Sequence, residues 1–183
     1  MNTKYFIVNN PAYNQVVAQQ NPETLGPAWL VKTIKYVDNA NEEMKALDDF
    51  NPKDTAIIDK REQVKIPFAP QFDSSASIQF IENLNDKISY SFHAASNQFV
   101  VFSEVYYPRG WKAFIDGKES AIAKVNYVLR GLAVPAGKHS IDFRFEPASY
   151  QNGLLVTRIA TTISFLFIAA GLWWEWHKRK KET

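Results

Sequence analysis

The chain has 183 residues, no cysteine and a formal net charge of +2, which allows one domain with a sizeable core and one further element. The lack of cysteine excludes disulfides, thiolate metal ligands and a cysteine nucleophile. The basic excess lies near the C-terminus, in Lys178, Arg179, Lys180 and Lys181. The body of the chain therefore lacks the clustered basic face of a nucleic-acid-binding protein, and we expect no nucleic-acid partner.

The N-terminal segment mixes short β-prone runs with polar stretches. Tyr5 to Val8 predicts a first strand, and Trp29 to Val37 predicts a second. Residues 9–27 are polar and contain prolines. We interpret them as a loop with one helical turn around Tyr13 to Gln20.

One short helix is predicted after Asn39. Asn39 can cap a helix, and Glu42 three residues later completes a capping box. The apolar stripe of this helix consists of Met44, Leu47 and Phe50. The acid pairs Glu42-Glu43 and Asp48-Asp49 then have plain explanations as capping residues and as a solvated face.

The β pattern becomes dense after this helix. Thr55 to Asp59 predicts a strand, and residues 61–77, which are rich in proline and small polar residues, predict a loop or an irregular edge. Ile78 to Glu82 and Ile88 to Ala94 predict a hairpin. Phe99 to Tyr107 is apolar on both faces apart from Ser103 and Glu104, which favours a central strand covered on both sides.

Three further strands follow, each bounded by a turn signal. Trp111 to Ile115 ends at Asp116-Gly117, a dipeptide that favours a tight hairpin turn. Tyr127 to Val134 ends at Pro135-Ala136-Gly137. Ser140 to Glu146 alternates strictly between apolar and polar residues, which is typical of a strand with one buried face.

These elements predict a mainly β fold. Seven to nine strands with short turns and one short helix favour a two-layer, jelly-roll-like β-sandwich over residues 1–150. Strand order cannot be derived from the pattern alone.

The sequence changes character after Asn152-Gly153. Residues 154–174 carry a single charge, Arg158, and an aromatic flank of Trp173, Trp174 and Trp176 lies at their C-terminal end. At about 1.5 Å per residue this segment spans the hydrocarbon core of a bilayer. We therefore expect a transmembrane helix over residues 154–176; the alternative is a buried amphipathic core helix.

Charge then predicts the orientation. The basic tail, residues 177–183, is expected in the cytoplasm, which places residues 1–150 outside. The N-terminal apolar run has only four residues, Tyr5 to Val8, and is too short for the core of a signal peptide. We therefore expect the chain to be the end of a longer membrane protein.

Several segments resemble one bacterial family. They are Gly26-Pro-Ala-Trp-Leu-Val-Lys32, Asn39-Ala-Asn-Glu-Glu-Met-Lys-Ala-Leu47, Glu104 to Lys118, Asn126-Tyr-Val-Leu-Arg130 and Val134-Pro-Ala-Gly-Lys-His139. In order and spacing they resemble the C-terminal region of YfhO-like membrane proteins, which are large polytopic proteins related to lipid-carrier-dependent glycosyltransferases with a GT-C type membrane core.

The resemblance implies a role in the cell envelope. It implies an extracytoplasmic accessory domain whose partners are the remaining transmembrane part of the same protein, membrane lipid, and a glycan or a polyprenyl-phosphate sugar. The catalytic acid of such enzymes lies in an early loop that this chain does not contain, so we expect no activity from the chain alone and no cofactor. The rival hypothesis is a non-enzymatic, membrane-anchored carbohydrate-binding or scaffold domain.

The sequence gives no catalytic residue but suggests a ligand-contact set. His93, His139 and His177 are too far apart for metal-type spacing, and we predict no metal site. Aromatic planes with Asp, Asn and Arg nearby can stack on sugars or hold a phosphate. The predicted set is Tyr107, Arg109, Trp111, Asp116, Asn126, Tyr127 and Arg130. The competing interpretation makes Trp111 and Tyr127 core residues, assigns Asp116 to its turn and pairs Arg130 with an acid.

Overall fold

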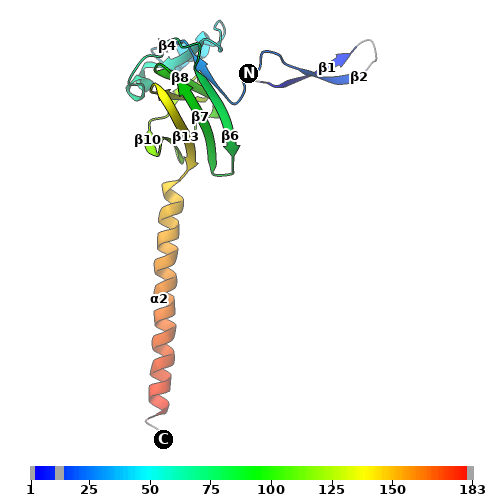
Figure 1. Ribbon diagram of the computed structural model, residues 1–183. Coiled ribbons are helices and arrows are strands. Elements are labelled where there is room, and N and C mark those ends of the chain that lie inside the picture. Colours follow the sequence, from blue (N-terminus) through cyan, green and yellow to red (C-terminus); the bar gives the residue numbers. More distant parts are fainter. Residues whose placement is uncertain (1–2, 11–14, 181–183) are drawn as a thin grey trace. The chain divides into compact units, whose positions relative to one another are not determined.

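A computed structural model describes residues 3–10 and 15–180 (Figure 1). The chain divides into two compact units, one ending at Phe145 and one beginning at Glu146. They are described separately.

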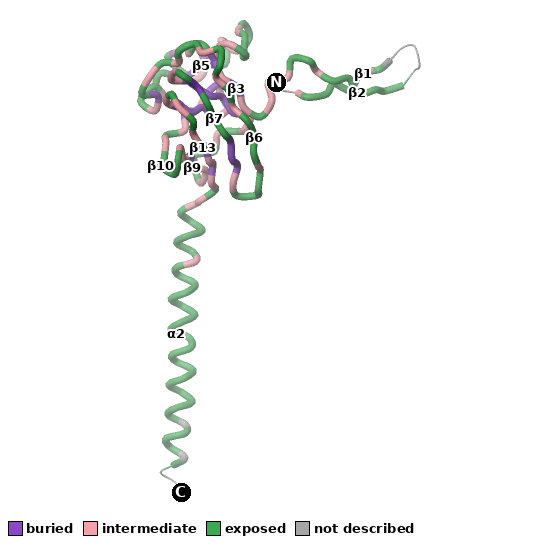
Figure 2. Tube along the Cα trace, in the orientation of Figure 1, coloured by how far each residue is buried: buried purple, intermediate pink, exposed green. Residues whose placement is uncertain are grey.

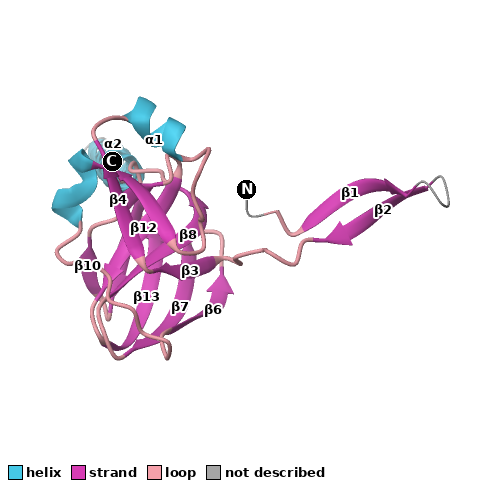
Figure 3. Ribbon diagram, turned by 90° about the horizontal axis from the view of Figure 1, so that it is seen from above, coloured by secondary structure: helices cyan, strands magenta, loops and turns pink. Residues whose placement is uncertain are grey.

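Two antiparallel sheets form the centre of the first unit. The five-stranded sheet has the order β10-β9-β13-β7-β6 and the four-stranded sheet the order β11-β12-β8-β3. The strands of the first are β6 Ser77–Asn83, β7 Lys87–Ala94, β9 Trp111–Ile115, β10 Lys118–Ser120 and β13 Gly137–Phe145. Those of the second are β3 Ala28–Val31, β8 Gln98–Val105, β11 Ala123–Val125 and β12 Leu129–Val134. Figure 3 shows these strands from above.

The pairing of the strands is nested. β7 pairs with β13 in one sheet, while the intervening β8 pairs with β12 in the other. The antiparallel pairs β7–β13 and β8–β12 therefore follow one another along the chain but lie in different sheets. This arrangement is typical of a jelly roll. The predicted mainly β, sandwich-like fold is confirmed, and the strand order is a result that only the structure supplies.

The core lies between the two sheets. Tyr90, Phe102 and Phe143 are each almost fully buried, and their rings meet edge to face, with centroids 5.0 Å apart for Tyr90 and Phe102 and 4.7 Å for Phe102 and Phe143. Such pairs add about 0.5–1.5 kcal/mol beyond the burial of their area. Figure 2 shows buried residues gathered in these strands.

A third layer covers the other face of the four-stranded sheet. It consists of β4 Thr33–Val37 and β5 Thr55–Asp59, which pair in parallel, with α1 Ala40–Ala46 and the 3-10 helix η1 Lys60–Lys65. A second buried cluster joins this outer layer to β8 through Ala56, Ile58, Phe99 and Val101. β8 is therefore covered on both sides, as its apolar sequence predicts.

The structure corrects two predictions in this layer. Trp29 to Val37 is not one strand, because Lys32 and Thr33 both donate to the backbone oxygen of Asp54 and lead the chain out of the central sheet. Residues 61–65 of the predicted loop belong to η1 instead. The cap at Asn39 is confirmed, since its Oδ1 accepts from two backbone N–H groups of α1.

The N-terminal segment forms a hairpin. β1 Tyr5–Asn10 and β2 Gln15–Gln20 pair antiparallel, with Val8 opposite Val17. The prediction of a loop with a helical turn is wrong for residues 15–20, because the β-branched pair Val16-Val17 favours an extended strand. Residues 13 and 14 of that predicted turn lie outside the described residues.

The second unit is one long helix. α2 runs from Ala148 to Arg179 and begins six residues before the predicted start, because Asn152-Gly153 does not interrupt it. Its apolar stretch has a mean hydropathy of 1.8 and is not buried within the structure, so by length and composition α2 can cross a membrane. The last residues of the predicted basic tail, 181–183, lie outside the described residues.

Candidate functional site

Arg130 is the most strongly constrained member of the predicted ligand-contact set. It lies on β12 with 4% of its surface exposed. Its Nη1 donates to Glu104 Oε2 at 2.9 Å, and its Nε donates to the backbone oxygen of Val105 at 3.0 Å. The guanidinium lies 4.5 Å from the centroid of the Trp111 ring and 5.4 Å from that of Phe143.

Burial sets the electrostatics around this residue. The hydroxyl of Tyr90 donates weakly to Glu104 Oε1 at 3.4 Å. Burial raises the pKa of Glu104 although Arg130 opposes this, and burial lowers the pKa of Arg130 while Glu104 counteracts it. Burial likewise raises the pKa of Tyr90. We call Tyr90, Glu104, Trp111, Arg130 and Phe143 the Arg130 cluster. Arg130 pairs with Glu104, as the competing interpretation of the sequence predicts.

An open hollow of about 260 Å³ lies beside this cluster. Its lining comes from the turn after β8 and from β9, β10 and β12: Tyr106, Tyr107, Pro108, Trp111, Lys112, Glu119, Ser120, Ala121, Ile122 and Arg130. Three members of the predicted set, Tyr107, Trp111 and Arg130, therefore meet here. Tyr107 is 50% exposed, so it is the aromatic ring among them that is most available to a ligand. Arg109 lies in the same turn and is exposed.

Asn126 and Tyr127 lie elsewhere, between the four-stranded sheet and the outer layer. Both have positive φ, 47° and 69°, a conformation that non-glycine residues rarely adopt. Asn126 exchanges two hydrogen bonds with Ile57 of β5, donating from its N–H and accepting at its Oδ1, both at 2.8 Å. The backbone N–H of Tyr127 donates to Glu43 Oε1 at 2.9 Å. These contacts give the two residues a structural role.

Glu43 on α1 is the residue that the sequence interpretation missed. It is fully buried, and its Oε2 has no hydrogen-bond partner in the described structure, with Lys124 Nζ 3.7 Å away. Burial raises its pKa, while the Tyr127 N–H and Lys124 oppose the shift. The expected solvated face for the Glu42-Glu43 pair is therefore wrong for Glu43. We call Glu43, Ile57, Lys124, Asn126 and Tyr127 the Glu43 cluster.

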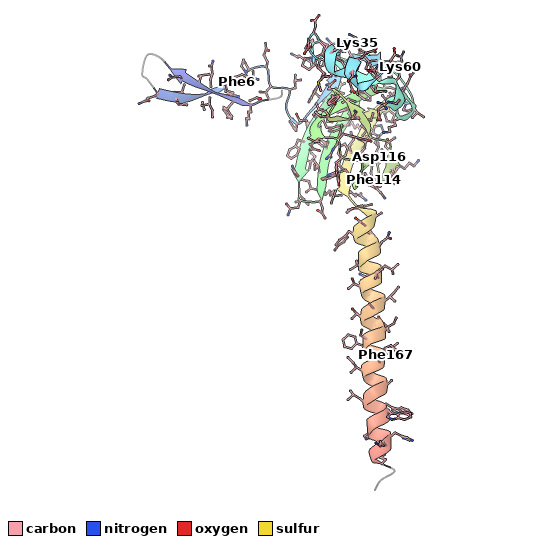
Figure 4. All side chains as sticks on the ribbon, turned by 180° about the vertical axis from the view of Figure 1, so that it is seen from behind. Phe6, Lys35, Lys60, Phe114, Asp116 and Phe167 are labelled. Carbon is pink, nitrogen blue, oxygen red and sulfur yellow. The ribbon has the colours of Figure 1, made fainter. Side chains whose placement is uncertain are left out.

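Asp116 forms a third, separate group at the turn between β9 and β10. Its Oδ2 lies 2.6 Å from His139 Nδ1, and its Oδ1 accepts from the Ser140 N–H at 2.9 Å. These contacts lower the pKa of Asp116. Asp116 and Gly117 have φ values of 50° and 80°, as a two-residue hairpin turn requires. Figure 4 shows Phe114 and Asp116 on β9 and its turn.

The structure thus divides the predicted set among three places. Signals for the missed residues differ in strength. Glu104 interrupts an apolar strand, so a cation opposite it could have been predicted. No local sequence feature indicates that Glu43 is buried, because its partner Tyr127 is 84 positions away.

Among the described residues, no group of three or more His, Asp or Glu side chains could hold a metal ion.

A compact β-sandwich and a helix able to cross a membrane together define a membrane-associated protein. Residues 73–157 match the family described as bacterial membrane protein YfhO, so this part of the chain is similar to that family. The match begins before β6 and extends into the first turns of α2.

A weaker similarity points the same way. The chain is 20% identical over 83 residues to the uncharacterized protein YfhO of Bacillus subtilis (strain 168), which covers 45% of this chain and 10% of that protein. The chain therefore spans only a small part of the length of this relative. No solved structure matches the chain.

Proposed function

We propose that this chain is an extracytoplasmic accessory domain, with its adjoining membrane helix, of a polytopic YfhO-like protein at the bacterial cell membrane. The rest of that protein would carry a lipid-carrier-dependent glycosyltransferase core acting on cell-envelope glycans. The observation that supports this most is the family match, which runs from before β6 into the first turns of α2. It supports treating this part of the sandwich and the start of the helix as one unit.

The sidedness in this proposal rests on the charges that follow the apolar part of α2. Lys178 and Lys180 lie at its C-terminal end, and Lys180 Nζ lies 3.8 Å from the centroid of the Trp176 ring. Trp173 stacks on His177 at 5.3 Å. Aromatic residues beside lysines are typical of the cytoplasmic membrane interface.

Topology mapping tests this part. This chain has no cysteine, so a cysteine at Lys118, which is exposed in the hairpin after β9, is the only one in this part of the protein, and its labelling is read against the full-length protein without the substitution. We expect it to react with a membrane-impermeant maleimide added to intact cells, and a reporter fused after Thr183 to be cytoplasmic. Reversal of both results rejects the orientation.

Assays of transfer test the enzymatic part. The full-length protein should transfer sugar from a polyprenyl-phosphate donor, whereas this chain alone should not. Turnover by this chain, abolished by one substitution within it, would show that the chemistry lies in the sandwich. A full-length protein with no donor-dependent transfer would favour the non-enzymatic alternative, a membrane-anchored carbohydrate-binding or scaffold domain.

The hollow beside Arg130 supports a second role, contact with a glycan or a lipid-linked sugar phosphate. Its rim combines the exposed ring of Tyr107 with Lys112 and Glu119, whose charged atoms lie 3.9 Å apart. We expect Tyr107→Ala to keep the melting temperature of the domain while reducing activity of the full-length protein. Full activity with the same melting temperature would leave the hollow without a ligand.

A further inference from the structure

The outer face of the five-stranded sheet carries a broad trough of about 810 Å³, which falls in the size range of small-molecule sites. It is lined by β6, β7 and β13 and shares no residue with the predicted ligand-contact set. Its lining residues are Ser77, Gln79, Ile81, Glu82, Lys87, Ser89, Tyr90, Ser91, Phe92, His93, Lys138, His139, Ser140 and Asp142.

Short side chains form the floor of this trough. Ser91 of β7 lies opposite Gln79 of β6 on one side and opposite Ser140 of β13 on the other. In the next row, His93 lies between Ser77 and Lys138. The side chains of Ser91 and Ser140 at the centre are short, and those of the residues beside them are longer. This difference in length leaves room for a ligand on the sheet face.

The two ends of the trough differ in their free hydrogen-bonding capacity. At one end, Asp142 is already bound, accepting from Ser89 Oγ at 2.7 Å and from Arg144 at 3.3 Å. Lys87 there pairs with Glu82 at 3.0 Å. At the other end, the six side chains of the two rows are exposed, and none of them forms a hydrogen bond or ion pair among the described residues.

We propose that this end, the serine trough formed by Ser77, Gln79, Ser91, His93, Lys138 and Ser140, binds a neutral glycan chain laid across the strands. Hydroxyl, amide and imidazole groups offer donors and acceptors together, which suits the hydroxyls of a sugar. Neighbouring strands lie about 4.8 Å apart, a spacing similar to the repeat of one ring in an extended glycan. The ion pairs at the far end balance their own charges, and Lys138 is the one formally charged side chain of the serine trough, so the trough lacks the cluster of basic side chains that a polyanion requires.

This inference goes beyond the proposed function, since it holds with or without a glycosyltransferase core. Tyr90 and Phe92 line the trough, but each is 1% exposed, so no aromatic platform from these residues is available for stacking. Binding would rest on hydrogen bonds that compete with water, and we expect dissociation constants in the range of about 1 mM.

Titration of the whole chain in lipid nanodiscs tests the proposal. Chitohexaose, cellohexaose and maltohexaose serve as neutral probes, with saturation-transfer NMR as the readout and dextran sulfate as the anionic comparison. We expect at least one neutral hexasaccharide to bind. Ser91→Arg, which fills the floor, should weaken that binding at least tenfold, and Gln79→Ala should weaken it about threefold.

Matched variants outside the trough provide the controls. Ser74→Arg and Gln63→Ala change exposed residues of the same type in the loop before β6 and in η1, and both should bind as the unmodified chain does. Equal unfolding midpoints for all variants exclude loss of the fold. The proposal is overturned if no hexasaccharide binds at about 10 mM, if Ser91→Arg binds normally, or if dextran sulfate binds more tightly than every neutral probe.

Discussion

Asn126 and Arg130 are four residues apart, yet they belong to two polar clusters of different character. Arg130 reaches into the sandwich, where its Nη1 and Nε both have acceptors and its plane lies on Trp111. Asn126 and its neighbour Tyr127 contact the outer layer, above a buried acid, Glu43, that keeps one oxygen without a hydrogen bond.

The difference concerns how each buried acid is compensated. Glu104 has a hydrogen-bonded guanidinium at 2.9 Å and the Tyr90 hydroxyl at 3.4 Å. Glu43 has one backbone N–H and an amine at 3.7 Å, too far for a hydrogen bond. A buried pair with good geometry is costly to break from one side, whereas an incompletely bound acid is destabilised in its ionised form. The Arg130 cluster should therefore respond most strongly to mutation, and the Glu43 cluster to pH.

Arg130→Met is expected to have the largest effect. It leaves Glu104 in a mostly buried position without its counter-charge, at a cost of about 3–5 kcal/mol in the free energy of unfolding. Urea denaturation followed by fluorescence measures it. The double variant Arg130→Met with Glu104→Gln removes both charges and should recover most of the loss, while a single-variant loss below about 1 kcal/mol would show that the pair behaves as a surface ion pair.

The contrast also explains what could be predicted from the sequence. Strict alternation places Glu104 on the same face of β8 as Val100 and Phe102, so the sequence already contained a buried acid in need of a cation. Strand positions and turns such as Asp116-Gly117 were predictable for the same reason, because short-range sterics and period-2 patterns determine them.

The outer layer lacks such local signals. α1 has only seven residues, its apolar Met44 is 46% exposed and its acid Glu43 is buried. The face of α1 that is buried is the one that contacts the turn at Asn126 and Tyr127, which is distant in sequence. The periodicity of the helix itself therefore does not predict which face is buried. The split of Trp29 to Val37 into two strands has the same origin, since Asp54 holds the chain at that point.

Trp111→Ala should have the next largest effect and tests whether the ring supports the Arg130 cluster. Trp111 packs on Arg130 and on Phe145, whose ring centroid is 5.4 Å away. The neighbouring Gly110 lies so close to Phe145 that an added Cβ would approach its ring to 2.5 Å, so the site is tightly packed. We expect a loss of about 3 kcal/mol, measured by thermal denaturation. Trp173→Ala on α2 is the control and should leave the melting of the sandwich unchanged.

Asn126→Ala tests the contact between sheet and outer layer. It removes the acceptor of the Ile57 N–H, which then lies buried and unpaired, and it places alanine at a φ of 47°. We expect a loss of about 2 kcal/mol from denaturant titration. Asn126→Gly removes the same acceptor but tolerates a positive φ, so it should lose less; equal losses would mean that the backbone strain at this position does not matter.

The smallest expected effect concerns Glu43 and has a distinct pH dependence. Because burial raises its pKa in the folded state above the ordinary value of 4.5, the folded protein binds this proton more tightly than the unfolded chain does. The resulting stability is fully present below the unfolded pKa and is lost as pH rises through the folded pKa.

Asp59 in the same layer has the opposite behaviour. Arg61 lowers its pKa to about 2, so its contribution is present above an unfolded pKa of 3.8 and is lost as pH falls towards 2. Above about pH 5 the Asp59 contribution is constant, so stability measured from pH 5 to pH 7 excludes it. Glu104, whose pKa burial also raises, titrates in the same sense as Glu43 and is present in every variant compared. Glu43→Gln keeps an acceptor for the Tyr127 N–H and has no charge to bury. We expect it to flatten the pH profile between these limits and to raise stability at pH 7 by less than about 1 kcal/mol.

Glu42→Gln, on the exposed side of α1, is the matched control and should leave the profile unchanged. A Glu43→Gln protein that keeps the original slope would assign that slope to Glu104, whose pKa burial also raises, and the distinction between the two clusters would not hold.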